Sequence, residues 1–422
     1  MTDIQIRDKI ERRAIGGLLP YARNSRTHSP EQVAQIAASM REWGWTNPVL
    51  VDESGGIIAG HGRVLAATSL GLAEVPVIVA SGWTEAQKRA YVIADNKLAE
   101  NAGWDDAMLR LEMGELQGLN FDLSLTGFDS DEIEELLFEE KPGNTDADST
   151  PPVQEQAKTQ PGDVWVLGQH RIMCGDSTSG AQVAALMDGQ QAMLMQTDPP
   201  YGIAYNSKDL HINGSNHAAI ENDDLIDGPK LQAFIEAMLV AALPSMAKHW
   251  ALYLWHPMLT QGTFFAAAAA AAADVLIHRQ IIWAKPSLVF GRGDYHWQHE
   301  LCFYGWVRGN RPPFYGARNQ TTMWAVGRET SADHPTAKPV GLWLPPIENH
   351  TKVGEITYEP FSGSGSQIIA AEQTGRRCYA MELSPNKVDV SVRRWQNFNG
   401  QHATLEATGA AFPDTVAVNA QK

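Results

Sequence analysis

Short apolar runs separated by polar turns dominate the first 140 residues. Apolar runs bounded by turn residues such as Ser54-Gly55-Gly56 are typical of strands, whereas apolar spacings of three and four residues are typical of helices. The pattern predicts strands at 49–51, 57–59 and 75–79, a helix that stops at Gly71, and further helices within 85–96 and 131–138. Residues 1–140 are therefore expected to form a small α+β domain with a helical extension.

A second pattern begins near residue 162. Apolar strands at 193–196, 251–255, 281–283 and 356–358 are separated by segments of helix length. Regular alternation of strands and helices is typical of an α/β protein with a doubly wound parallel sheet. We expect such a Rossmann-like sheet over residues 162–400, preceded by the smaller α+β domain.

Two segments are poor in large apolar side chains. Residues 141–161 are rich in Pro, Thr, Asp, Gln and Gly, a composition that does not order itself by burial. The segment is predicted to be an interdomain linker. Residues 401–422 are small and polar, and they are predicted to form a disordered tail.

Composition and charge narrow the possible classes. The net charge of −16 argues against a protein that coats nucleic acid without specificity. The segment from Arg279 to Lys338, however, contains eight basic and four acidic residues, so a local basic surface is compatible with the acidic total. Three distant cysteines provide neither a disulfide framework nor a metal site. No apolar run reaches the length of about 18 residues that a membrane span needs, and no apolar segment follows the charged N-terminus. These features favour a cytoplasmic protein without a membrane partner.

Two motifs follow predicted strands of the second domain. The strand at 193–196 leads into Asp198-Pro199-Pro200-Tyr201, which by itself is also compatible with a proline-stiffened loop. The strand at 356–358 leads into the turn Phe361-Ser362-Gly363-Ser364-Gly365, then a helix and a strand that ends in Glu382. Glycines allow backbone N–H groups to approach a ligand, and a carboxylate at the next strand end suits ribose hydroxyls. Ile368 replaces the third glycine of the dinucleotide fingerprint, so the expected ligand is nucleotide-like but has no diphosphate.

Together these residues resemble the amino-methyltransferases of DNA, which use S-adenosylmethionine. The resemblance covers 162 to about 399, and the order of the two motifs resembles the β-class permutation. It implies a catalytic loop at Asp198, Pro199, Pro200 and Tyr201. It also implies cofactor contacts from Asp176 to the adenine, from Glu382 to the ribose, and from Lys338, Phe361, Gly363 and Gly365 around the methionine end. The family usually has Asp-Pro-Phe where this chain has Glu359-Pro360-Phe361.

The chemistry of an exocyclic amine agrees with these residue types. The Asp198 carboxylate and the Pro199 carbonyl can accept the amine hydrogens, and Tyr201 offers an aromatic face to a base that has left the duplex. Aspartate at the first position resembles the adenine branch of the family, and cytosine-N4 methylation is the alternative. No cysteine follows a proline, which excludes methylation at a cytosine ring carbon. A non-catalytic DNA-binding regulator with a decayed catalytic domain is the other alternative.

Basic residues interleaved with aromatic ones are candidates for contacts to double-stranded DNA. The competing interpretation is an ordinary surface hairpin. The candidate residues are Lys285, Arg292, Arg308, Arg311, Arg318 and Arg328.

Residues 19–105 resemble the ParB/sulfiredoxin-like domain that is fused to phage and prophage methyltransferases. The motifs that carry this resemblance are 24–29, 60–63 and 93–97. The turn at Gly60-His61-Gly62-Arg63 could hold the phosphate of a nucleotide, but nucleotide-binding members have Gly-Glu-Arg-Arg there. A turn that packs a helix onto the sheet is the favoured interpretation, and a DNA contact or a homodimer surface stays open.

Overall fold

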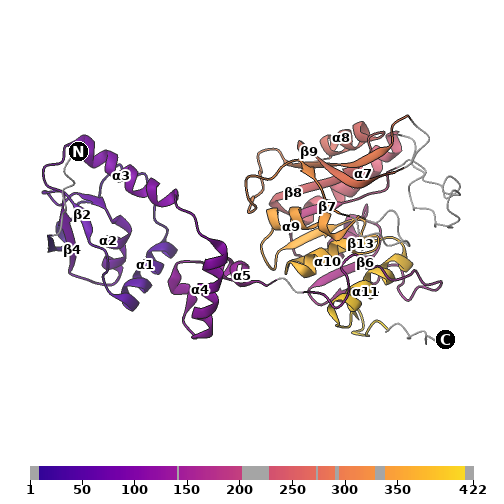
Figure 1. The fold of residues 1–422 in the computed structure, drawn as a ribbon, viewed down its shortest axis with the longest axis horizontal. Coiled ribbons are helices and arrows are strands. Elements are labelled where there is room, and N and C mark those ends of the chain that lie inside the picture. Colours follow the sequence, from indigo (N-terminus) through magenta and orange to yellow (C-terminus); the bar gives the residue numbers. More distant parts are fainter. Residues whose placement is uncertain are drawn as a thin grey trace. The chain divides into compact units, whose positions relative to one another are not determined.

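The chain divides into two compact units, Met1–Leu137 and Phe138–Lys422, in a computed structural model (Figure 1). The structure describes residues 9–139, 142–201, 228–271, 274–289, 294–327 and 338–413. Among the helices of these residues, none combines the length and the apolar character needed to span a bilayer.

The first unit is built on a four-stranded sheet with the strand order β1-β4-β2-β3. Its strands are β1 (Ile10–Ala14), β2 (Val49–Val51), β3 (Ile57–Ala59) and β4 (Glu74–Val79). Its helices are α1 (Pro30–Trp43), α2 (His61–Ser69), α3 (Glu85–Glu100), α4 (Asp106–Gly118) and α5 (Ser130–Leu137). The strands and helices predicted from the apolar pattern are present.

Polar caps explain where the helices of this unit begin. Ser29 caps α1 through its hydroxyl, which accepts a hydrogen bond from the Gln32 amide at 3.2 Å. Thr84 and Gln87 form a reciprocal capping box at the start of α3. Such caps pair backbone N–H groups that the helix itself leaves unpaired. Gly44, with φ 73°, ends α1 in a conformation that favours glycine.

The second unit contains a ten-stranded mixed sheet in the order β11-β9-β10-β8-β7-β12-β13-β6-β5-β14. The strands are β5 (Val164–Leu167), β6 (His170–Cys174), β7 (Ala192–Thr197), β8 (Met246–His256), β9 (Val275–Val289), β10 (Trp297–Val307), β11 (Met323–Trp324), β12 (Ile356–Glu359), β13 (Arg377–Glu382) and β14 (Thr404–Leu405). The α/β class is confirmed. The five adjacent strands β8, β7, β12, β13 and β6 are parallel to one another, and β11 also pairs parallel with β9. Strand β10 pairs antiparallel with β9 and β8, and β5 pairs antiparallel with β6 and β14. The connections within the β9–β10 and β5–β6 pairs are short enough for hairpins, whereas β8 and β14 are distant in sequence from the strands they pair with.

Helices cover both faces of this sheet and form two cores. Buried side chains of α6 (Gly180–Met187), α7 (Gly228–Ala242) and α8 (Gln261–Ala270) share one core. Those of α9 (Leu344–His350), α10 (Ser366–Gln373) and α11 (Pro385–Asn399) share the other. Figure 1 shows α7 near α8 and α10 near α11 around the strands. The double-sided cover explains why the central strands are buried along their length.

The segment predicted to be a free linker is ordered over residues 142–161 and lies against the second unit. Asn144 donates its amide hydrogen to the Phe398 carbonyl at 2.8 Å, and the Asp148 carboxylate accepts from the Val340 amide at 2.7 Å. Polar contacts to groups distant in sequence order the segment, so its lack of apolar residues was misleading.

The predicted disordered tail is ordered as far as residue 413. Strand β14 pairs antiparallel with β5, and Phe412 is 1% exposed with its ring centre 4.9 Å from that of Trp165. One aromatic side chain thus supplies the burial that the small residues around it lack. Residues 414–422 lie outside the described residues.

Candidate active site

Strands β7, β12 and β13 lie side by side and parallel, so their carboxyl ends share one edge of the sheet. The Asp198 loop follows β7, the glycine turn follows β12, and Glu382 ends β13. The Thr197 hydroxyl donates to Glu359 Oε1 at 2.8 Å, which links the first two strand ends directly. Ligands of open α/β sheets bind at such an edge.

The side chains of Asp198, Tyr201 and Lys338 form a closed triangle. The Tyr201 hydroxyl donates to Asp198 Oδ1 at 2.7 Å, and Lys338 Nζ lies 2.5 Å from Asp198 Oδ2 and 3.0 Å from the Tyr201 hydroxyl. Burial, followed by the nearby Asp198 charge, raises the pKa of Tyr201 well above its ordinary value. The phenol therefore stays neutral, and both carboxylate oxygens of the loop have fixed partners.

Lys338 has an ammonium group that is directed toward the Asp198–Tyr201 loop. Its side chain is 4% exposed, and Nζ lies 5.0 Å from the ring centre of Trp255. The Lys338 carbonyl accepts a hydrogen bond from Ser366 at the start of α10, so the backbone stays close to the glycine turn. The residue thus bridges the two motifs, and its predicted contact with the cofactor remains a prediction.

The glycine turn binds the Glu382 carboxylate through backbone groups. The Gly363 amide donates to one oxygen and the Ser384 amide to the other, each at 2.9 Å. Gly365 has φ 80°, and a Cβ there would lie 3.0 Å from the Ser391 Cβ, so close packing of α10 on α11 requires glycine. A Cβ at Gly363 would meet no atom within 4 Å, which leaves open space beside the turn.

Asp176 and Phe361 flank this turn. Asp176 follows β6, the strand next to β13, and its exposed carboxylate accepts from the Thr178 amide at 2.9 Å. The Phe361 ring centre lies 5.7 Å from that of Phe234 on α7. The predicted cofactor residues therefore gather around adjoining strand ends.

Glu359 is a buried carboxyl between the two motifs. Glu359 is only 1% exposed. Besides the hydrogen bond from Thr197, its Oε1 accepts one from the Phe361 amide at 2.9 Å. Burial raises its pKa to about 8, although the hydrogen bonds from Phe361 and Thr197 oppose the shift. The position where the family usually has Asp thus holds a carboxyl that is neutral at pH 7.

Glu300 on β10 joins the site without a signal in the local sequence. Its Oε2 lies 3.1 Å from Lys338 Nζ, and its Oε1 lies 2.5 Å from the Nζ of Lys285 on β9. Burial alone would raise the pKa of Glu300, but the two lysines lower it to about 2. Lys285 is 16% exposed and forms this ion pair because β9 pairs with β10. Its contact with DNA stays a prediction.

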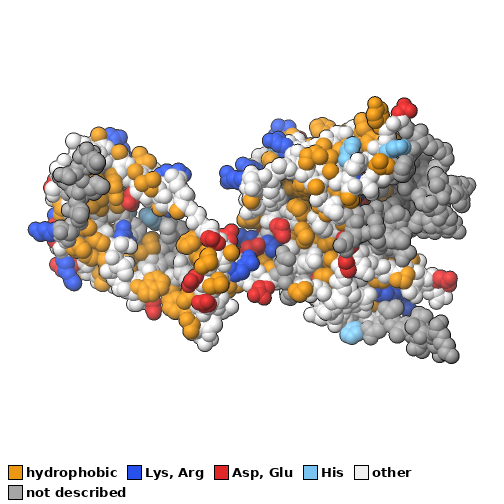
Figure 2. Space-filling view, in the orientation of Figure 1, with side chains coloured by type: hydrophobic (Ala, Val, Ile, Leu, Met, Phe, Trp, Pro, Cys, Tyr) orange, Lys and Arg blue, Asp and Glu red, His pale blue; other side chains and the backbone are white. Residues whose placement is uncertain are grey.

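The other candidate DNA residues differ in their surroundings. Arg308 pairs with Asp274 at 2.5 Å, whereas Arg311 and Arg318 are exposed. Arg292 and Arg328 lie outside the described residues. On the face drawn in Figure 2, basic side chains of the second unit form small separate clusters.

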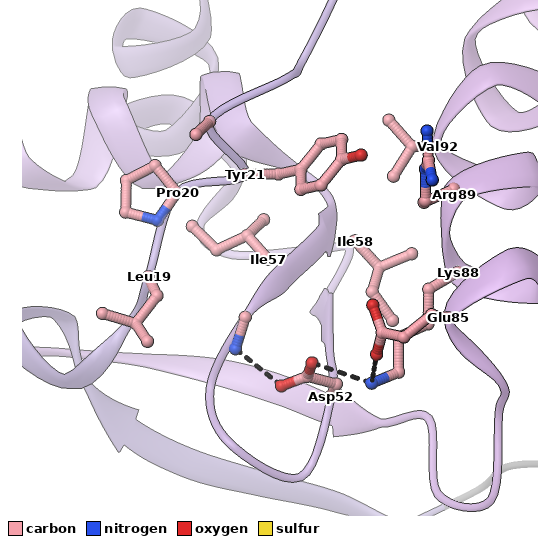
Figure 3. Close-up of a pocket in the computed structure, with 12 residues that line it drawn as sticks. Leu19, Pro20, Tyr21, Asp52, Ile57, Ile58, Glu85, Lys88, Arg89 and Val92 are labelled. Carbon is pink, nitrogen blue, oxygen red and sulfur yellow. Dashed lines mark hydrogen bonds and ion pairs between the residues drawn. The ribbon is translucent and has the colours of Figure 1, made fainter.

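Two cavities lie in the first unit. One of about 220 Å³ is bounded by Tyr21, Ile58 and an Asp52–Lys88 ion pair at 3.0 Å (Figure 3). The other, of about 170 Å³, brings together the three motifs of the first unit, with Asn24, His28, Gly60, Arg63 and Asp95 in its wall. Arg63 donates to the Asn47 carbonyl at 2.8 Å, which supports a role for this turn in packing.

Two family models match parts of the chain, and the second match crosses the boundary between the two units. Residues 18–96 match the family described as ParB N-terminal domain, and residues 107–161 match the ParB-methyltransferase HTH domain. The ParB-like nuclease domain-containing protein YnaK of Escherichia coli K12 is 60% identical over 81 residues, which are 19% of this chain and 93% of YnaK.

The second unit is similar to methyltransferases. The type II methyltransferase M.Cfr9I of Citrobacter freundii is 37% identical over 100 residues, covering 23% of this chain and 33% of that protein. The chain thus spans about a third of the length of that curated relative.

Two solved structures are similar to this chain at low sequence identity. The M1.HpyAVI–SAM complex has a TM-score of 0.41 at 15% identity and covers 53% of this chain and 97% of its own. The PvuII DNA methyltransferase, which is cytosine-N4-specific, has a TM-score of 0.44 at 12% identity and covers 57% and 90%. By its N-terminal unit the chain belongs to the ParB-like family, and a methyltransferase domain follows that unit.

Proposed function

We propose that the second unit transfers a methyl group from S-adenosylmethionine to the exocyclic amine of a flipped adenine in double-stranded DNA. One observation carries this proposal: Asp198 and the glycine turn that binds Glu382 lie at neighbouring strand ends. A hydrogen bond of 2.8 Å from Thr197 to Glu359 joins these two ends. The proposed acceptor for the amine hydrogens therefore adjoins the turn proposed to hold the cofactor.

In this proposal the protein's residues act on the exocyclic amine, which is the less reactive of the two reactants. The lone pair of an exocyclic amine is delocalised into the base, so the amine is a poor nucleophile. Hydrogen bonds from this amine to the Asp198 carboxylate and the Pro199 carbonyl favour a pyramidal nitrogen. The two prolines limit movement of these acceptors, and the Tyr201 ring stacks on the base.

The turn residues fit the proposed cofactor. The Glu382 carboxylate suits ribose hydroxyls, exposed Asp176 suits an adenine amine, and the open space at Gly363 admits a ligand against the backbone. When bound, S-adenosylmethionine supplies an electrophilic methyl group. Holding the two reactants in line accounts for much of the expected rate gain.

Substitution of Asp198 tests the proposal. We expect Asp198→Ala to lower DNA methylation at least about a hundredfold, the usual scale of a lost acid–base or acceptor group, while cofactor binding is retained. Incorporation of labelled methyl groups measures the rate. A thermal shift measures binding, since cofactor at 100 times its Kd stabilises by about 2.7 kcal/mol. Asp163→Ala, in a loop where the carboxylate caps only Gln160, is the control.

The products separate the alternatives. Mass spectrometry of nucleosides from DNA treated with the protein should detect N6-methyladenine. N4-methylcytosine in its place would overturn the adenine assignment but keep the amine chemistry. A thermal shift by the cofactor without any methylated base would support a regulator, and full activity of Asp198→Ala would refute the mechanism.

A further inference from the structure

Four charged side chains form a continuous row that ends at the catalytic loop. From β9 inward, Lys285 contacts Glu300 at 2.5 Å, Glu300 contacts Lys338 at 3.1 Å, and Lys338 contacts Asp198 at 2.5 Å. The row alternates in sign and contains two positive and two negative groups. Residues far apart in sequence meet here because β10 lies between β9 and β8, and β8 adjoins β7.

Burial makes the pairing in this row energetically important. The Lys338 side chain is 4% exposed and those of Glu300 and Asp198 are 26% exposed. A buried charge is strongly destabilising unless it is paired and hydrogen-bonded. A lysine ammonium has three N–H donors, and Lys338 has three acceptors within 3.1 Å: Asp198, Tyr201 and Glu300.

We propose that Glu300 is a positioning residue for methyl transfer, which holds the Lys338 ammonium on Asp198 and Tyr201 and is itself balanced by Lys285. The inference rests on the proposed function. Two contacts leave an ammonium free to pivot, whereas the third, from Glu300 at 3.1 Å, sets its direction. The Asp198 oxygens and the Tyr201 ring are then presented to the base in one arrangement.

The charges around Lys338 give this role a measurable sign. The groups that face it are Asp198 and Tyr201 of the loop, Glu300 and Cys302 of β10, Glu359 of β12 and the Trp255 ring of β8. Burial lowers the pKa of Lys338, but Asp198 and Glu300 outweigh burial and raise it. Loss of the Glu300 charge therefore releases the Lys338 proton at a lower pH, and loss of Lys285 does not.

Paired variants test the inference in the full chain. In Glu300→Gln we expect kcat for DNA methylation to fall about tenfold, less than the hundredfold or more for a group that touches the base, because Glu300 acts through Lys338. The Kd of S-adenosylmethionine should be unchanged. The alkaline decline of kcat should move to lower pH by about one unit, and Glu300→Asp, which keeps the charge, should restore its position. Glu236→Gln on α7 is the matched control.

Lys285→Met should not lower the pH of the alkaline decline of kcat, in contrast to Glu300→Gln. This variant removes a positive charge from the row, so its alkaline decline should stay in place or move to higher pH. General damage to the fold would not shift the two declines in different directions. An unmoved decline in Glu300→Gln, or a downward shift in Lys285→Met, overturns the role of Glu300. Absence of methylation by the unaltered protein at every pH refutes the proposed function instead.

Discussion

At the scale of single residues, Glu359 connects the two halves of the candidate site. It accepts hydrogen bonds from Thr197, just before the catalytic loop, and from Phe361, which opens the glycine turn. A carboxyl with these partners and almost no exposure fixes the distance between the strand ends. Being neutral, it adds no charge beside Asp198.

This buried carboxyl predicts a pH dependence of stability. The pKa of Glu359 is raised from 4.5 to about 8, because burial outweighs its hydrogen bonds. Between these two values the folded protein holds a proton that the unfolded chain has lost, so the free energy of unfolding falls as pH rises. The loss approaches about 1.4 kcal/mol per pH unit within the window.

Replacing the titrating carboxyl of Glu359 with an amide should remove this pH dependence of stability. We expect urea unfolding of Glu359→Gln to lose less stability between pH 5 and pH 7 than the unaltered protein, whereas Glu236→Gln follows the unaltered protein. Parallel pH profiles for all three proteins would show that Glu359 is ionised in the folded state.

At the scale of elements, the C-terminal end of the 142–161 segment is bound by one buried acceptor in α11. Asp389 is 0% exposed and accepts from the Lys158 amide at 2.7 Å and from the Thr159 amide and hydroxyl at 3.1 and 2.6 Å. Hydrogen bonds to a buried carboxylate are stronger than neutral ones. They order a segment that buries little apolar surface of its own.

Asp389→Ala should therefore release the segment. Loss of the acceptor leaves four donors without it, three from Lys158 and Thr159 and one from the buried Arg393, and we expect the free energy of unfolding to fall by about 3 kcal/mol. Trypsin should cut after the exposed Lys158 slowly in the unaltered protein and rapidly in Asp389→Ala. Asp389→Asn, of similar shape, separates charge from geometry. Equal cleavage in the unaltered protein and in Asp389→Ala would contradict the anchoring role.

At the scale of the whole molecule, a net charge of −16 must coexist with DNA as the proposed substrate. Phosphate binding then depends on local cations rather than on the total charge. Arg311 and Arg318 are exposed, whereas the Arg308 charge is balanced by Asp274. These arginines allow a matched comparison.

We expect Arg311→Ala and Arg318→Ala to weaken DNA binding and to lower the slope of log Kd against log salt by about 0.9 per lost phosphate contact. Arg308→Ala should change either quantity less, because its charge is already paired. Fluorescence anisotropy at two or more salt concentrations measures both. Unchanged affinity and slope in the first two variants would remove them from the DNA surface.

The sequence by itself determined the features that depend on neighbours along the chain. The periodicity of 49–51, 57–59 and 75–79 predicted strands, and the alternation after residue 162 predicted an α/β unit, because side chains repeat with the period of each element. The prolines of the Asp198–Tyr201 motif and the glycines of the Phe361–Gly365 motif likewise mark where a strand ends, because both residue types restrict or permit backbone conformations locally.

Only the tertiary structure decided which distant groups meet. Glu300 gives no local signal, and Lys285 resembled a surface cation, until the pairing of β9 with β10 brought both to Lys338. The 142–161 segment and Phe412 were misjudged in the same way, since their partners are Asp389 and Trp165. Hydrogen bonds, ion pairs and burial between remote residues depend on the path of the chain, which composition and periodicity do not contain.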